Sequence, residues 1–382
     1  MAPHDTEEYR TPGQLIEALL EQRGWTQRVL AIVIGMGESG VNKIVSNKQP
    51  IDAAVAIRLE EALGVSASRF LALQHHYDLA KARIAERPDP ARSLRGLLFT
   101  DLPIAEMIER GWIEASDIRN VRQIESQLMK FFRATSLEEI EILPHAAKKT
   151  ATHMPATPAQ IAWLYRVKAL AGDMLVERYS PIAVREAIAS LSRLLAAPEE
   201  ARHVPRILSE CGVRFVIVET LEAAKIDGVC FWLDDASPVV GLSMRYDRID
   251  NFWFVLRHEL EHVLRLHGRS AVMLDSELEG NRAGVGDDIP EEERVANEAA
   301  ASFCVPKGKI ESFIARKAPF FAERDLLGFS TTLRIHPGLV AGQLAHRTGR
   351  YDRFRKYLVK MRGIVAPGAI VDGWGEIAPL DL

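Results

Sequence analysis

The residues best suited to chemistry are His258, Glu259 and His262, which form the pattern His-Glu-x-x-His. Side chains four residues apart lie on one face of an α-helix, so both imidazoles could bind the same metal ion. Zinc accepts two neutral histidines together with a third protein ligand and a water molecule. Glu259 would take a proton from that water as it attacks a peptide carbonyl. The pattern therefore predicts a zinc-dependent peptidase, with accidental occurrence as the alternative.

The helix expected to carry this motif, from about Arg248 to His267, is apolar enough to be buried. Two histidines and two glutamates are costly to bury unless a metal ion or strong partners stabilise them. The alternative is a surface helix that exposes these polar side chains to water. Burial of Glu261 is the least favourable, because a second acid beside the site needs either solvent or a cation such as Arg257 or Arg265.

A third metal ligand is expected in the segment that follows Pro290. Its first acids, Glu291, Glu292 and Glu293, are also what a helix dipole favours in a first turn, so they could simply begin a helix. Glu293 and Asn297 are four residues apart and share a helix face. Glu293 could therefore bind zinc while Asn297 forms a hydrogen bond with a ligand imidazole.

The motif at 258–262 and the later Glu-x-x-Ala-Asn at 293–297 resemble the two motifs of the ImmA/IrrE metallopeptidase family. The likeness covers roughly residues 205–355, including the upstream KIDG and the downstream RIHPGLVAGQLAHRTG. It implies a gluzincin-like domain that hydrolyses peptide bonds with zinc as cofactor. It also implies the roles of the site residues: His258, His262 and Glu293 as zinc ligands and Glu259 as general base.

A peptidase of this kind also needs a donor that stabilises the oxyanion of the tetrahedral intermediate. Four residues could supply it: His336, Tyr246, Arg245 and His267. These residues have structural alternatives as well. His336 could cap a helix that begins at the next residue, and Arg245 could pair with Asp247 or Asp250. The sequence does not single out one donor.

Residues 12–79 resemble helix-turn-helix domains of the XRE and HigA type. In this resemblance Thr26–Val33 is the first helix of the motif, Gly35 and Met36 form the turn, and Glu38–Val45 is the recognition helix. The implied DNA contacts are Gln27 with a phosphate and Ser39, Asn42 and Lys43 with the major groove.

The net charge of this module gives only weak support for DNA binding. Residues 11–84 contain eight Lys and Arg against seven Asp and Glu, a net charge of +1. Glu38 would approach phosphates unfavourably, and Gly40 lowers the helix propensity of the recognition helix. We expect DNA binding, with a protein-interaction or dimerisation module as the alternative.

The chain is expected to be an α+β protein. Its parts are an all-α helix-turn-helix domain at 11–84, a helical connecting region at 93–200, a metallopeptidase domain at 205–362 and an irregular C-terminal tail at 363–382. A proline-containing linker at 86–92 follows the first domain. Short β-rich runs at 213–219, 228–233 and 238–244 predict a small, mainly antiparallel sheet before the motif helix.

Composition narrows the class of protein further. The 382 residues carry 48 Lys and Arg against 52 Asp and Glu, a net charge of −4, so any DNA contact must be local. The three cysteines lack CxxC spacing, which fits a reducing compartment. The first ten residues lack the basic start and apolar stretch of a secretory signal. We expect a cytoplasmic protein without membrane contact.

These features favour a DNA-associated zinc endopeptidase that regulates transcription by cleaving a partner protein, such as a repressor or an antitoxin-like regulator. The alternative is a DNA-binding transcription factor or antitoxin whose zinc domain senses or binds a partner without turnover. Self-cleavage at the 86–92 linker is a third hypothesis. A homodimer is compatible with all three.

Overall fold

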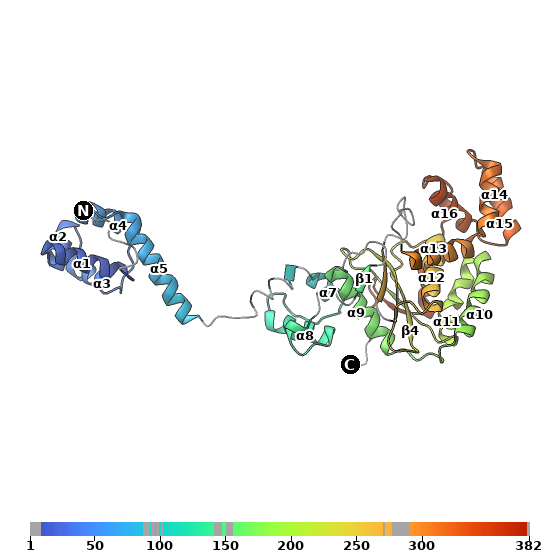
Figure 1. Ribbon diagram of the computed structural model, residues 1–382, viewed down its shortest axis with the longest axis horizontal. Coiled ribbons are helices and arrows are strands. Elements are labelled where there is room, and N and C mark those ends of the chain that lie inside the picture. Colours follow the sequence, from blue (N-terminus) through green and yellow to red (C-terminus); the bar gives the residue numbers. More distant parts are fainter. Residues whose placement is uncertain are drawn as a thin grey trace. The chain divides into compact units, whose positions relative to one another are not determined.

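The computed structural model describes residues 9–86, 92, 96, 99–100, 102–140, 147–149, 156–269, 272–276 and 290–379. The chain divides into two compact units, Met1–Pro90 and Ala91–Leu382 (Figure 1). The expected linker at 86–92 spans the boundary between them, but its residues 87–91 lie outside the described residues. Among the described residues, all strands belong to the second unit.

The first unit is a bundle of helices. They are α1 Pro12–Arg23, α2 Gln27–Val33, α3 Glu38–Val45, α4 Ala53–Leu63 and α5 Ala67–Ala85. Thr11 begins α1 with a capping box, in which its hydroxyl accepts a hydrogen bond from the backbone N–H of Gln14 (3.2 Å). Between α2 and α3 the chain reverses at Gly35, whose φ of 65° lies in the left-handed region that favours glycine. Leu30 of α2 and Val41 of α3 are buried in one core, which holds the two helices together.

The second unit is built around a six-stranded sheet. Its strands are β1 Ala147–Lys149, β2 Arg214–Val218, β3 Ile226–Trp232, β4 Pro238–Leu242, β5 Val272–Ser276 and β6 Ile370–Asp372, in the spatial order β1-β5-β3-β4-β2-β6. β3 runs antiparallel to β4 and β5, whereas the pairs β1–β5, β2–β4 and β2–β6 are parallel. The expectation of a mainly antiparallel sheet is therefore wrong. β4 lies between β2 and β3, and the hydrophobic pattern of single strands does not encode such an order.

Helices cover both faces of this sheet. The α-helices described in this unit are α7 Ile104–Glu109, α8 Val121–Phe132, α9 Pro158–Gly172, α10 Pro181–Ser192, α11 Val204–Glu210, α12 Ile249–Leu264, α13 Glu291–Cys304, α14 Lys307–Lys317, α15 Glu323–Leu333, α16 Pro337–Thr348 and α17 Arg362–Val365. Figure 1 shows α9 on one side of the sheet and α10, α11 and α12 on the other. Side chains of β2 alternate accordingly: Val216 and Val218 join the core under α9, and Phe215 and Ile217 join the core under α12.

Two segments that we expected outside the metallopeptidase domain belong to this layered unit. The C-terminal tail, expected to be irregular, contributes β6, which pairs with β2. α9, from the expected connecting region, packs on the sheet, and the indole N–H of its Trp163 donates to the carbonyl of Val218 (2.9 Å). Arg166 of α9 donates from Nε to a carboxylate oxygen of Asp372 in β6 (2.9 Å). The connecting region and the tail are therefore parts of one unit with the sheet.

Candidate metal centre

The motif helix α12 is buried, so its polar side chains are shielded from solvent. It packs against β3, β4 and α13, and its apolar residues from Phe252 to Val263 supply much of the core on that face of the sheet. His258, Glu259 and His262 are each 0% exposed. The alternative of a surface helix is therefore wrong, and these groups need partners within the protein or from a ligand.

The two imidazoles and Glu293 converge on one point. Nε2 of His258 lies 3.0 Å from Nε2 of His262. The carboxylate of Glu293 reaches both, with Oε2 3.3 Å from the first Nε2 and Oε1 3.3 Å from the second. Glu293 is buried on α13, whereas Glu291 and Glu292 are exposed in the same helical turn. The acidic start of α13 thus combines a charged first turn with one carboxylate that faces the imidazoles.

A fourth donor, Asp275, was missed by the sequence analysis. Its Oδ2 lies 3.5 Å from Nε2 of His258 and 3.9 Å from Nε2 of His262. Together with Glu293 these residues form what we call the donor cluster, whose ligand atoms all lie within 4.8 Å of one another. Asp275 lies in β5, in a segment that the sequence analysis does not assign to a strand. The only signal was an acid within the short apolar run Val-Met-Leu-Asp-Ser.

Each imidazole of the donor cluster is held at its other nitrogen. Oδ1 of Asn297 lies 3.1 Å from Nδ1 of His258, as expected from the four-residue spacing of Asn297 and Glu293. Nδ1 of His267 lies 3.0 Å from Nδ1 of His262. His267, considered above as an oxyanion donor, is therefore a neighbour that orients the imidazole of His262. Such contacts leave Nε2 of each ring facing the other donors.

Glu259 lies beside the cluster, against the backbone of β3. A Cβ atom added to Gly228 would lie 2.2 Å from Oε1 of Glu259, so only glycine leaves room for this carboxylate. Gly228 ends the KIDG segment, and its role was not inferred from the sequence. Burial raises the pKa of Glu259 well above its usual range, and the charges of Asp275 and Glu293 raise it further.

Charge inside the donor cluster is balanced between imidazoles and carboxylates. Burial alone would lower the pKa of His258, but the neighbouring carboxylates of Asp275 and Glu293 raise it to about 10. Burial alone would raise the pKa of Glu293, but hydrogen bonds from both imidazoles leave it below its usual value. The pocket of carboxylates therefore favours a positive charge at its centre, which either a proton or a metal ion can supply.

Glu261 pairs with two arginines. This was one of the two expectations for Glu261, the other being exposure to solvent. Arg257 donates to Oε2 (2.8 Å) and Arg265 to Oε1 (2.9 Å). Burial alone would raise the pKa of Glu261, but these two arginines leave it below its usual value. The two arginines therefore stabilise the carboxylate of Glu261 without any contribution from the donor cluster.

Each of the three remaining candidates for an oxyanion donor makes a contact outside the donor cluster. Arg245 pairs with Asp227 (3.1 Å), not with Asp247 or Asp250. The guanidinium of Arg245 lies over the ring of Tyr246, with its Cζ atom 4.7 Å from the ring centroid. Nδ1 of His336 accepts a hydrogen bond from the backbone N–H of Gly338 (3.1 Å), so this histidine caps α16. Sequence reasoning had given the capping role as an alternative for His336.

The donor cluster fits zinc by the chemistry of its atoms. Two imidazole nitrogens and two carboxylates are ligands that zinc accepts, and the four are buried close enough to share one ion. The three cysteines are buried and do not belong to the cluster. The second unit therefore contains a candidate nitrogen-oxygen site for a divalent metal, formed by residues from α12, β5 and α13.

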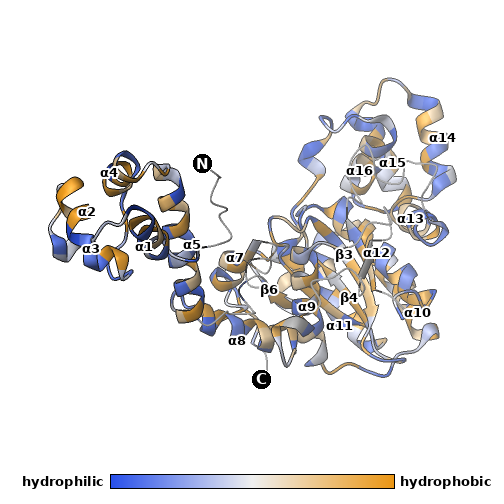
Figure 2. Ribbon diagram, turned by 60° about the vertical axis from the view of Figure 1, so that its left-hand side comes forward, coloured by the Kyte–Doolittle hydropathy of each residue, from blue (hydrophilic) through white to orange (hydrophobic). Residues whose placement is uncertain are grey.

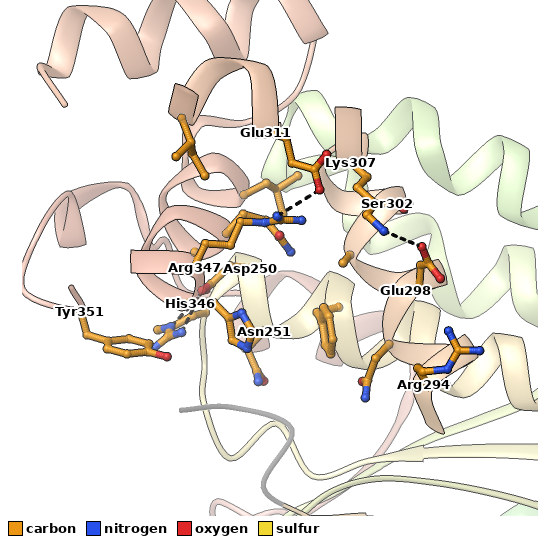
Figure 3. Close-up of a pocket in the computed structure, with 18 of the residues that line it drawn as sticks. Asp250, Asn251, Arg294, Glu298, Ser302, Lys307, Glu311, His346, Arg347 and Tyr351 are labelled. Atoms are coloured by element: carbon orange, nitrogen blue, oxygen red, sulfur yellow. Dashed lines mark hydrogen bonds and ion pairs between the residues drawn. The ribbon is translucent and has the colours of Figure 1, made fainter. Parts of the chain in front are cut away.

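A cavity of about 870 Å³ lies between α12, α13, α14 and α16. Many of its lining residues are charged or polar, and they include the ion pair of Lys307 with Glu298 (3.0 Å; Figure 3). Asn297 lines the cavity and also contacts Nδ1 of His258. The cavity therefore lies behind this imidazole and not between the atoms of the donor cluster.

The residues expected to contact DNA lie on α2 and α3 of the first unit. Ser39, Asn42 and Lys43 of α3 are exposed, while Val41 of the same helix is buried. The side-chain amide of Asn42 donates to Oε1 of Gln27 (3.3 Å), which joins α3 to the start of α2. All four predicted DNA-contacting residues therefore belong to the two helices of the motif.

Comparison with known proteins identifies the class of the first unit. The family model for helix-turn-helix domains matches residues 16–70. This match confirms the helix-turn-helix prediction and supports a role as a DNA-binding regulator. No curated protein matches the chain. None of the helices in the described ranges combines the length and apolar character needed to span a membrane.

Proposed function

We propose that this protein is a DNA-binding regulator whose second unit is a zinc endopeptidase. Its substrate would be a partner protein, such as a transcriptional repressor or an antitoxin-like regulator. The observation that carries the proposal is the convergence of His258, His262 and Glu293 within 3.3 Å of one another, with Glu259 next to them in α12. The resemblance to ImmA/IrrE metallopeptidases supports the same reading.

The residues around the metal position would have different roles in hydrolysis. Bound zinc would supply Lewis-acid chemistry, activating water and polarising the peptide carbonyl. Asn297 and His267 fix the ligand imidazoles, so that each Nε2 points at the metal position. Glu259 is placed to accept a proton from water and to return it to the leaving amine. Burial and the charges of Asp275 and Glu293 raise the pKa of Glu259, and a bound cation would offset those charges so that the carboxylate can accept the proton.

A second candidate function is a regulator that binds its partner without turnover. Two observations favour it. The donor cluster and Glu259 are at most 1% exposed, so a substrate needs a rearrangement to reach them. In the first unit, α2 exposes apolar side chains, with Ile32 74% and Val33 50% exposed, and Figure 2 shows this helix as hydrophobic. An exposed apolar face of this kind is typical of a protein-interaction surface.

Comparison of protein N-termini in native cells tests the proposal. Cells would express the wild type, Glu259→Gln or Glu291→Gln, and new N-termini would be mapped by mass spectrometry. Glu259→Gln keeps the side-chain shape but removes the proton acceptor, so we expect partner cleavage only with the wild type and Glu291→Gln. Glu291 is the matched control because it is exposed and pairs with Arg294. Identical N-termini in all three cell lines would contradict the peptidase and favour the non-cleaving regulator.

A further inference from the structure

Asp275 completes the donor cluster in a way that a catalytic zinc site does not require. Catalytic zinc sites keep three protein ligands and leave one position to water or substrate. In this chain a second carboxylate approaches both imidazoles, with Oδ2 of Asp275 3.5 Å and 3.9 Å from the two Nε2 atoms. Asp275 is 1% exposed, as deeply buried as Glu293. Four protein donors correspond to a closed coordination shell.

The strand that carries Asp275 holds it in this position. β5 pairs antiparallel with β3, with Leu274 opposite Val229 and Met273 opposite Cys230. Met273 joins the core under α12, whereas Leu274 joins the core under α9. Because alternate residues of a strand point to the same face, Asp275 shares the face of Met273 and points toward α12.

β5 also occupies the part of β3 that an extended substrate would use. Of the strands described, β5 alone pairs with β3 on the side away from β4. Without β5, this side of β3 would be an open edge beside Gly228, which contacts Glu259. Extended peptides commonly bind by adding a strand to such an edge, through backbone hydrogen bonds. β5 therefore lies where the backbone of a substrate would pair.

We infer that Asp275 is a fourth protein ligand of the metal and that β5 is an internal competitor for the substrate position. The inference rests on the proposed function, because it requires a metal in the donor cluster. In the closed arrangement Asp275 holds the coordination position that a substrate would need. A partner protein would have to displace β5 from β3 before hydrolysis, so cleavage would be coupled to partner recognition.

Cobalt binding to the full-length chain tests this inference without a substrate. Co²⁺ replaces zinc as a coloured probe, and acetohydroxamate reports whether a ligand can enter the metal site. The proteins compared are the wild type, Asp275→Ala, His258→Ala and Asp235→Ala, the last a control because Asp235 is exposed on the same unit. Absorbance titration would give the Co²⁺ affinity, the visible spectrum and the acetohydroxamate affinity of each protein.

We expect Asp275→Ala to bind Co²⁺ about tenfold or more weakly than the wild type, with an altered visible spectrum, because it loses one donor. Its Co²⁺ complex should bind acetohydroxamate at least about tenfold more tightly than the wild-type complex, since one position is open. Asp235→Ala should match the wild type. Asp275→Asn, which preserves side-chain shape, serves the same comparison if the alanine variant does not fold.

The outcomes separate this inference from the proposed function. Unchanged Co²⁺ affinity and spectrum in Asp275→Ala, with Co²⁺ binding lost in His258→Ala, would overturn the role of Asp275 and leave the metal centre intact. Equal acetohydroxamate affinity in the wild type and Asp275→Ala would overturn the closed state. A wild type that binds no Co²⁺ would instead contradict the metal centre itself.

Discussion

Oδ1 of Asn297 lies 3.1 Å from Nδ1 of His258, on the opposite side of the ring from the Nε2 that faces Glu293. This contact fixes the orientation of the imidazole, and loss of such partners lowers metal affinity about 10- to 100-fold in other proteins. We therefore expect Asn297→Ala to weaken zinc binding by about this factor in a chelator competition assay. Glu298→Ala is the matched control, because the neighbouring Glu298 pairs with Lys307. Equal zinc affinity in both variants would remove Asn297 from the metal centre.

Gly228 should be required for hydrolysis but not for metal binding. A Cβ atom at this position would lie 2.2 Å from Oε1 of Glu259 and would displace the carboxylate. General acid–base catalysis contributes about 10²- to 10⁴-fold to rates, so Gly228→Ala should reduce partner cleavage by about 10²-fold or more. Zinc content should remain that of the wild type. Gly172→Ala, which meets no atom within 4 Å, should cleave normally; a similar loss in Gly172→Ala would point to a general effect on folding.

The residues of α12 could be predicted as a site because their spacing is local. His258 and His262 need only one helix to converge, and the hydrophobic residues around them predict that helix. Glu293 was reached through its spacing to Asn297 and the family resemblance. Asp275 could not be reached in this way, since its position depends on the pairing of β5 with β3, which the local sequence does not encode.

The same distinction applies to the fold. The helix-turn-helix is set by contacts within one short stretch, and both its helices and its turn at Gly35 were predicted. The sheet depends on strands far apart in the sequence, and β6 lies more than 150 residues after β2, its partner. The tail around Asp372 was therefore predicted to be irregular. Short strands carry too little pattern to reveal such pairing.

Asp372 should be a major contributor to the stability of the second unit. Its carboxylate accepts hydrogen bonds from Arg166 of α9 (2.9 Å from Nε) and from the indole of Trp112 (2.8 Å). Removal of one partner from a buried ion pair typically costs about 3–5 kcal/mol, because the other charge stays buried. Asp372→Ala should lower the free energy of unfolding of this unit by about that amount in urea titrations. Glu376→Ala, an exposed neighbour, should change it by less than about 0.5 kcal/mol; equal effects would contradict the prediction.

Asn42 and Lys43 should affect DNA binding in different ways. Operator DNA selected from a random pool with the wild type would be used in fluorescence titrations at several salt concentrations. Lys43→Ala should weaken binding to all sequences and reduce the salt slope by about 1, as expected for a lost phosphate contact. Asn42→Ala should cost about 1–3 kcal/mol at the operator only, as expected for a lost base contact. Failure of the wild type to bind DNA at low salt would instead favour a protein-interaction module.

The zinc content of the purified full-length chain is the measurement closest to the proposed function. The ligand atoms of the donor cluster lie within 4.8 Å of one another, so they can share one ion, and we expect one zinc per chain by elemental analysis. His258→Ala and His262→Ala should each lower this value sharply, whereas Glu291→Gln, in the exposed first turn of α13, should not. Full zinc content in both histidine variants, or no zinc in the wild type after zinc loading, would contradict the metal centre.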